Sequence, residues 1–132
     1  MLSTIAIIGL IFIQQAQPSQ QQPATSYREA YDQCEREKRP LLAVISAKWC
    51  GSCQVMKRDT ILPMLRDKEF RDVVVVIIDK DQEPELAAKL MQGETLPQTI
   101  LIDRPGPNRK QFALPGTATR SRIKELLQKI FK

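Results

Sequence analysis

The chain has 132 residues, of which 42% are hydrophobic and 27% charged, a balance typical of one small globular domain. Its formal net charge is +5, but only 5% of residues are aromatic and no nucleic-acid motif is present, so nucleic-acid binding is not expected. Three cysteines are too few for a domain held together mainly by disulfides.

The first 26 residues carry no charged side chain and fall into two segments of different composition. Residues 2–13 are mostly apolar but too short to span a bilayer, which takes roughly 20 residues. Their length suits the core of a signal peptide, so residues 1–17 are predicted to be a signal peptide or an uncleaved N-terminal anchor. The protein is therefore expected to be exported, periplasmic or otherwise extracytoplasmic, with tethering to the membrane as an alternative. Residues 18–25, rich in Gln and Pro, are predicted to be a flexible linker.

A first helix is predicted after Ser26, which can cap it together with Glu29 three residues later. Pro40 ends this segment. Its apolar stripe at helical spacing consists of Tyr27, Ala30, Tyr31 and Cys34. We interpret Cys34 as a buried small side chain, and an exposed regulatory thiol is the alternative.

The next two elements are a buried strand and a long helix that meet at a pair of cysteines. Branched apolar residues at 41–46 predict the strand, and helical spacing predicts a helix from Cys50 to about residue 67. Pro63 should kink or divide this helix. Its predicted inward side chains are Val55, Met56, Ile61, Leu62 and Leu65.

Two cysteines separated by two residues, at the junction of a strand and a helix, are typical of a redox site. Cys50 would lie at the helix N-terminus, where backbone N–H groups favour a thiolate, the nucleophile of disulfide exchange. Cys53, one turn later, would be close enough to attack the resulting mixed disulfide. The small residues Gly51 and Ser52 between them should keep the turn tight and the Cys50 sulfur accessible.

Three more strands and two more helices are predicted in the rest of the chain. The segment at 73–78 is a continuous β-branched run, which indicates a central strand buried on both faces. The later elements are predicted to be a helix at 83–91, a strand at 98–103, an antiparallel edge strand at 109–114 and a last helix that starts after Thr117 or Thr119. The last helix should bury Ile123, Leu126, Leu127 and Ile130.

Three features in the same order resemble the thioredoxin family. The segment 49–53, Trp-Cys-Gly-Ser-Cys, is similar to the family's active site, with Ser52 where thioredoxin has proline. Residues 95–99, Thr-Leu-Pro-Gln-Thr, resemble its loop with a cis-proline, here Pro97, before a strand. Gly116 precedes a terminal amphipathic helix, as in the family.

The resemblance implies an α/β fold, a three-layer α/β/α sandwich over residues 26–132. Its mixed central sheet would have about four strands, and the family's usual strand before the first helix has no good candidate here. It also implies a thiol–disulfide oxidoreductase in which Cys50 is the nucleophile and Cys53 the resolving thiol. The residues expected to contact the substrate are Trp49, Gly51, Ser52, Leu96, Pro97 and Gly116, and Gly116 should permit a close backbone approach.

The expected partners are protein disulfides and a membrane or thioredoxin-like dithiol that donates electrons. A monomer is expected, with no metal and no cofactor besides the Cys50–Cys53 disulfide. Many thioredoxins have a buried acid six residues before the first cysteine, where this chain has Val44. That replacement should slow deprotonation of Cys53. The absence of histidine argues against a strongly oxidising motif and favours a reductant or a moderately poised exchanger.

Two other functions remain open from the sequence. The chain could be a non-catalytic protein-binding module that has kept the fold, although both cysteines of the pair are present. It could instead bind a metal through Cys50 and Cys53, although a closed zinc site usually needs four ligands and the chain has no histidine.

Overall fold

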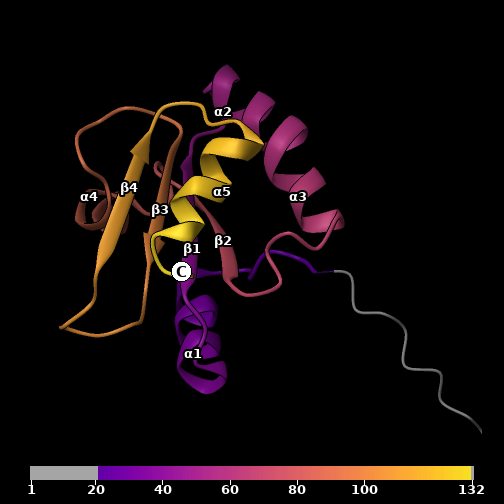
Figure 1. Cartoon of the computed structure of the whole chain (residues 1–132). Helices are drawn as coiled ribbons and strands as arrows, with labels where there is room; N and C mark the ends of the chain where they lie inside the picture. Colours follow the sequence, from indigo (N-terminus) through magenta and orange to yellow (C-terminus); the bar gives the residue numbers. More distant parts are fainter. Residues whose placement is uncertain (1–20, 132) are drawn as a thin grey trace, which may run out of the picture.

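A four-stranded mixed sheet in the order β2–β1–β3–β4 forms the middle layer of the fold (Figure 1). The computed structural model describes residues 21–131. β1 (Leu41–Ser46) is parallel to β2 (Val74–Asp79) and antiparallel to β3 (Gln98–Ile102), and β3 is antiparallel to β4 (Gln111–Pro115). Every end of these strands lies within two residues of the predicted end, which confirms the four predicted strands.

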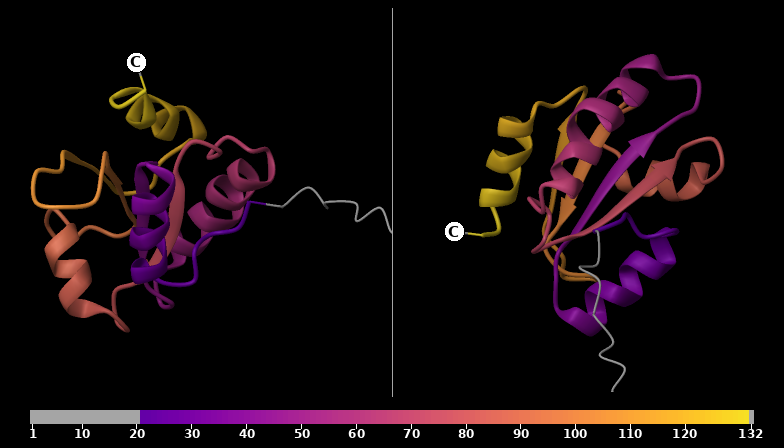
Figure 2. Two further views of the ribbon diagram at one scale, coloured as in Figure 1. Left: turned by 90° about the horizontal axis from the view of Figure 1, so that it is seen from below. Right: turned by 90° about the vertical axis from the view of Figure 1, so that its right-hand side faces the viewer.

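Helices cover both faces of the sheet and make the two outer layers, as Figure 2 shows. On one face lie α2 (Gly51–Met56), the π-helical turn η1 (Lys57–Ile61), α3 (Leu62–Arg66) and α5 (Arg120–Gln128). On the other face lie α1 (Tyr27–Glu37) and α4 (Pro84–Leu90). The predicted three-layer α/β/α sandwich is therefore confirmed.

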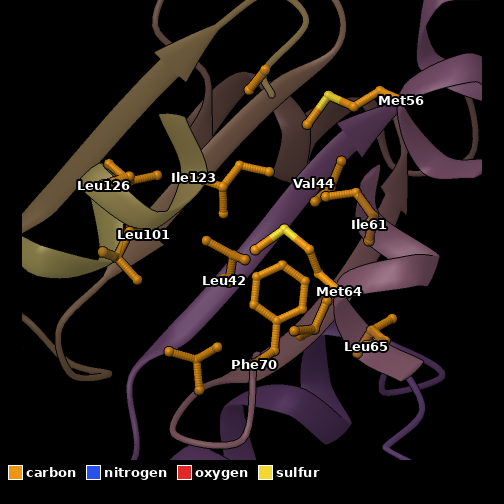
Figure 3. Close-up of a cluster of buried hydrophobic side chains, with 13 residues drawn as sticks. Leu42, Val44, Met56, Ile61, Met64, Leu65, Phe70, Leu101, Ile123 and Leu126 are labelled. Carbon is orange, nitrogen blue, oxygen red and sulfur yellow. The ribbon is translucent and has the colours of Figure 1, made fainter. Parts of the chain in front are cut away.

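The strands read as continuous apolar runs because both faces of the sheet are buried. Successive side chains of a strand point to opposite faces. Leu42 and Val44 of β1 accordingly join the core under α3 and α5 (Figure 3), and Ala43 joins the core under α1 and α4. Each outer layer is thus fixed to the sheet by its own apolar cluster.

The strand at residues 74–79 lies at an edge of the sheet, so its predicted central position was wrong. Its side chains are buried because helices cover both faces of the sheet. A continuous apolar run therefore indicates burial of both faces but not whether a strand has one neighbouring strand or two. Among residues 21–131, one bridge forms on the outer side of β2, in which the Ala24 N–H donates to the Val75 carbonyl at 2.7 Å. Side chains also reach this edge, where Arg39 Nη2 and Gln21 Nε2 donate to the Val73 carbonyl at 2.7 and 3.3 Å.

The helix after Cys50 is interrupted before Pro63, as expected, but the interruption is a π-helical turn. The Leu62 N–H donates to the Lys57 carbonyl, five residues back, and Pro63 has no N–H to continue the α-helical pattern. The added residue changes which side chains face the sheet.

Two predicted core residues of this helix are exposed, Val55 at 46% and Leu62 at 42%. Cys53 and Met56 set the buried face of α2, and Val55, one residue before Met56, is turned about 100° away from it. The next buried positions are Ile61, at the end of the π-helical turn, and Met64 and Leu65 in α3. Met64 is therefore a core residue that the sequence analysis missed.

The N-terminal part of the domain begins with the predicted cap. The Ser26 side chain accepts the Glu29 N–H at 3.1 Å, but the Glu29 carboxylate accepts from the Thr25 N–H and not from Ser26. Residues 21–25 of the predicted linker belong to the described part and contact the sheet at Ala24. The predicted signal peptide or anchor at residues 1–17 lies outside the described residues. In the part that the structure describes, no helix is long and apolar enough to cross a membrane.

Cys34 is buried between α1 and the sheet with 1% exposure, which confirms the interpretation of a small core side chain. Burial raises the pKa of this thiol from an ordinary 9.0 to about 11, although the nearby Arg39 charge acts in the opposite direction. In the native protein Cys34 should therefore resist alkylation at neutral pH, because the thiol is both protonated and inaccessible.

The raised pKa predicts a loss of stability in alkali. Between pH 9 and 11 the Cys34 thiol is ionised in the unfolded chain but still largely protonated in the folded one. Ionisation therefore stabilises the unfolded state relative to the folded state. The free energy of unfolding should fall by about 2 kcal/mol from this group alone by pH 11. Urea unfolding at several pH values, with the disulfide reduced, should show this fall in the wild type and a smaller one in Cys34→Ala. Equal falls in the two proteins would contradict the assignment.

Candidate active site

The strand β1 ends at Ser46, and a short turn brings the chain to Cys50, the N-cap of α2. The Cys50 N–H donates to the Ala47 carbonyl at 3.1 Å, which closes the turn. Cys50 itself is extended, and its Sγ accepts the backbone N–H of Cys53 at 3.2 Å. The first cysteine of the pair thus occupies the capping position where a side chain meets the unpaired N–H groups of a helix.

Cys50 and Cys53 form a disulfide in this structure. Cys50 is 7% exposed and Cys53 2%. Cys50 remains the more exposed of the two, but it is less accessible than the sequence analysis expected. The reason is that Ala47 and the half-buried Leu96 pack around the disulfide.

Two hydrogen-bond donors surround the Cys50 sulfur. Besides the Cys53 N–H, the Ser52 hydroxyl lies 3.4 Å from Cys50 Sγ and can donate to it, since a disulfide sulfur carries no hydrogen. Donors aimed at a sulfur stabilise negative charge on it when the disulfide is reduced. Ser52 was expected to keep the turn tight and to contact the substrate, and the contact of its hydroxyl with Cys50 Sγ is an additional one that proline could not make.

Val44 lies on β1, at the position where many thioredoxins have a buried acid. It is 3% exposed and lies among Met56, Ile61 and other apolar side chains on this face of the sheet (Figure 3). The buried polar residues of the described chain are Ser46, Gln98 and Thr99, so none of its buried side chains is a carboxylate. The site therefore offers no internal acid that could take the proton of Cys53.

Trp49 is 70% exposed and is held by an acid that the sequence analysis did not identify. Its indole Nε1 donates to Asp81 Oδ2 at 2.7 Å. Asp81 follows β2, where the Asp79 carboxylate accepts the Asp81 N–H at 2.8 Å. Acids directly after one parallel strand lie near the end of the neighbouring strand, but this placement does not show which of them contacts Trp49, because that depends on the conformation of the loop.

The loop before β3 brings Leu96 and Pro97 to the disulfide. The peptide bond between these two residues is cis, and Leu96 packs against the apolar cluster of Ala47, Cys50 and Cys53. The Pro97 carbonyl accepts the Gly116 N–H at 2.8 Å, which ties this loop to the end of β4.

No part of this chain packs closely against Gly116, because a Cβ atom at this position would meet no atom within 4 Å. The close approach expected there from a substrate backbone stays a prediction. The φ angle of Gly116 is +81°, in the left-handed region that residues other than glycine rarely adopt. Gly51 likewise has open space around it, and it is exposed together with Ser52.

Two large apolar side chains close to the cysteines in the sequence are exposed, Trp49 at 70% and Val55 at 46%. Val55 also borders a pocket of about 150 Å³ whose lining is partly polar and includes Asp59, Thr60 and Thr117. Within residues 21–131, no group of three or more His, Cys, Asp or Glu side chains is placed to hold a metal ion.

Comparisons with known proteins agree with this geometry. A family model described as thioredoxin-like matches residues 22–103. Chloroplastic thioredoxin Y2 of Arabidopsis thaliana is 35% identical over 101 residues, which cover 74% of this chain and 57% of that protein. The chain thus spans little more than half the length of the curated relatives it matches.

Solved structures show the same fold. A thioredoxin from Thermus thermophilus superimposes with a TM-score of 0.66 at 19% identity, over 80% of this chain and 83% of that one. A structure described as DsbH oxidoreductase gives 0.65 at 18% identity, over 90% and 92% of the two chains. At these identities the two structures support the fold.

Proposed function

Because the chain belongs to the thioredoxin-like family, as its sequence motifs predicted, we propose that it is a thiol–disulfide oxidoreductase acting on other proteins. The thioredoxin-like fold and the paired cysteines support a redox role. A single observation carries the proposal. Cys50 is the N-cap of α2, forms a disulfide with Cys53, and accepts the Cys53 N–H at its sulfur.

The reaction proceeds in two exchange steps. The Cys50 thiolate attacks one sulfur of a substrate disulfide, forms a mixed disulfide and releases the other substrate sulfur as a thiolate. Cys53 then loses its proton and attacks Cys50 Sγ, which releases the second substrate thiolate and forms the Cys50–Cys53 disulfide. Two electrons pass from the dithiol to the substrate, and the two released thiolates take up protons.

The absence of a buried acid limits the second step. With Val44 on the sheet, the Cys53 proton must leave to water or to the departing substrate thiolate. Cys53 is 2% exposed, so water reaches it poorly. The resolving step should therefore be slow near neutral pH and accelerate as the pH rises.

The substrate is proposed to lie across Trp49, Gly51, Ser52, Leu96, Pro97 and Gly116. Supporting this, Trp49 is exposed and fixed by Asp81, and Leu96 touches the disulfide. We further propose that the protein works as a monomer outside the cytoplasm and is recharged by a membrane or thioredoxin-like dithiol. The uncharged, mostly apolar composition of residues 1–17 supports the location outside the cytoplasm.

The redox potential of the Cys50–Cys53 couple tests the proposal and gives its direction. Equilibration with glutathione or dithiothreitol should yield a single two-electron transition. A value near roughly −270 mV would make the protein a reductant, and one near −120 mV would make it a disulfide donor. A protein that remains folded but forms no reversible Cys50–Cys53 disulfide at any poise would refute the enzymatic function.

A further inference from the structure

Gln98 is a fully buried polar residue that follows Pro97 directly and begins β3. Its side-chain amide makes three hydrogen bonds, all to the backbone of the loop before Pro97. Oε1 accepts the Gln92 N–H at 2.7 Å, and Nε2 donates to the carbonyls of Gln92 and Thr95 at 3.0 and 3.3 Å. A polar side chain is costly to bury unless it is paired, and here the pairing is entirely with one loop.

The loop has few other attachments. Residues 92–95 are exposed, and Leu96 is half-buried where it packs against the cluster that contains Cys50. Among the described residues, the backbone–backbone hydrogen bonds outside helices and strands include none to residues 92–96. The side-chain amide of Gln98 therefore anchors residues 92–96 to the core through its hydrogen bonds. The last residue of this loop, Leu96, packs against the disulfide.

The neighbouring residue shows that burial alone does not explain these bonds. Thr99 is also buried, at 0% exposure, but its Oγ1 has no hydrogen-bond partner. The strand thus tolerates one unpaired hydroxyl while the amide next to it is paired three times. The two residues form a natural comparison, one that contacts the loop and one that does not.

We propose that Gln98 is a positioning residue for the reaction. It docks the 92–96 loop so that Leu96 lies beside Cys50, and it thereby shapes the surface on which a protein substrate is held. This inference rests on the proposed disulfide exchange between proteins. Gln98 does not touch the sulfur atoms, so it should affect the binding of large substrates more than the chemistry of the cysteines.

The test replaces Gln98 by methionine, which has similar length and no amide. With the loop released, KM for insulin disulfides should rise about tenfold, as expected for lost hydrogen bonds in a binding surface. Exchange with oxidised dithiothreitol, which needs only the cysteines, should change less than about twofold. The matched control Thr99→Val should leave both substrates unaffected.

Hydrogen exchange gives a readout independent of activity. The Gln92 amide should be protected in the wild type and in Thr99→Val, and should exchange at least about tenfold faster in Gln98→Met. If Gln98→Met does not fold, Gln92→Pro removes the same N–H from the loop side without changing the core. Met91 already has the extended conformation that precedes proline. Gln92→Ala keeps the N–H and is the control for that variant.

The outcomes separate this inference from the function it rests on. An inactive but folded wild type refutes the exchange reaction, and Gln92 protection can still be compared between the variants. An active wild type with an unchanged KM in Gln98→Met refutes the positioning role. Equal losses for insulin and dithiothreitol would also refute it, because they would indicate a general structural defect.

Discussion

Replacement of Cys50 by serine should abolish disulfide exchange and leave the fold intact. The serine hydroxyl is similar in size to the thiol and can still accept the Cys53 N–H, so the cap of α2 is retained. It does not ionise near neutral pH, and turnover of a protein disulfide should fall on the order of 10⁴-fold. Reduction of insulin measures this loss, and circular dichroism checks the fold.

Cys53→Ser should have a different effect, because it removes only the second step. Cys50 can still attack a substrate, and the mixed disulfide should accumulate as a covalent adduct detectable by mass spectrometry under non-reducing conditions. Cys34→Ala is the control, since Cys34 is buried on the opposite face of the sheet and should not change turnover. Turnover by Cys50→Ser, or an adduct formed equally by Cys50→Ser and Cys53→Ser, would contradict the assigned roles.

Phe70→Ala should cause the largest loss of stability. Phe70 has 0% exposure and lies in the cluster with Leu42 and Met64 (Figure 3). Loss of a buried phenyl ring removes apolar contacts and leaves a cavity, which typically costs about 3–5 kcal/mol. This is a large share of the roughly 5–15 kcal/mol that stabilises most domains, and urea unfolding should show it as a much lower midpoint.

Phe131→Ala is the matched control for this experiment. Phe131 follows α5 and is 43% exposed, so the same substitution there should cost less than about 1 kcal/mol. Similar losses at the two positions would mean that the core does not depend on Phe70 in the way its burial indicates.

The order of strands and helices and the placement of the cysteine pair could be predicted from local patterns. The apolar run before Cys50 and the helical spacing after it meet at the point where the structure places the disulfide. These features depend on residues close in the sequence. The same is true of the Ser26 cap, whose partner is three residues away.

Other parts of the site depend on contacts between distant residues or on backbone detail. Asp81 meets Trp49 across 32 positions of sequence, and an acid in a loop has no pattern that reveals such a partner. The exposure of Leu62 follows from the extra residue in the π-helical turn, which apolar periodicity does not register. The edge position of β2 was missed because two covered faces give a strand the same composition at a sheet edge as at its centre.

That edge bears on how the protein stays dispersed in solution. A strand made of valine and isoleucine up to its last residue, Asp79, with open peptide groups along one side, is the kind of segment that adds strands from other molecules and aggregates. Ala24, Arg39 and Gln21 use the Val75 and Val73 carbonyls that such an intruding chain would need. Two of these three residues precede α1, so part of the predicted linker occupies hydrogen-bonding positions that a strand from another molecule would use. A shortened domain that starts at α1 would lose these two contacts while keeping both cysteines, and we expect it to self-associate more readily.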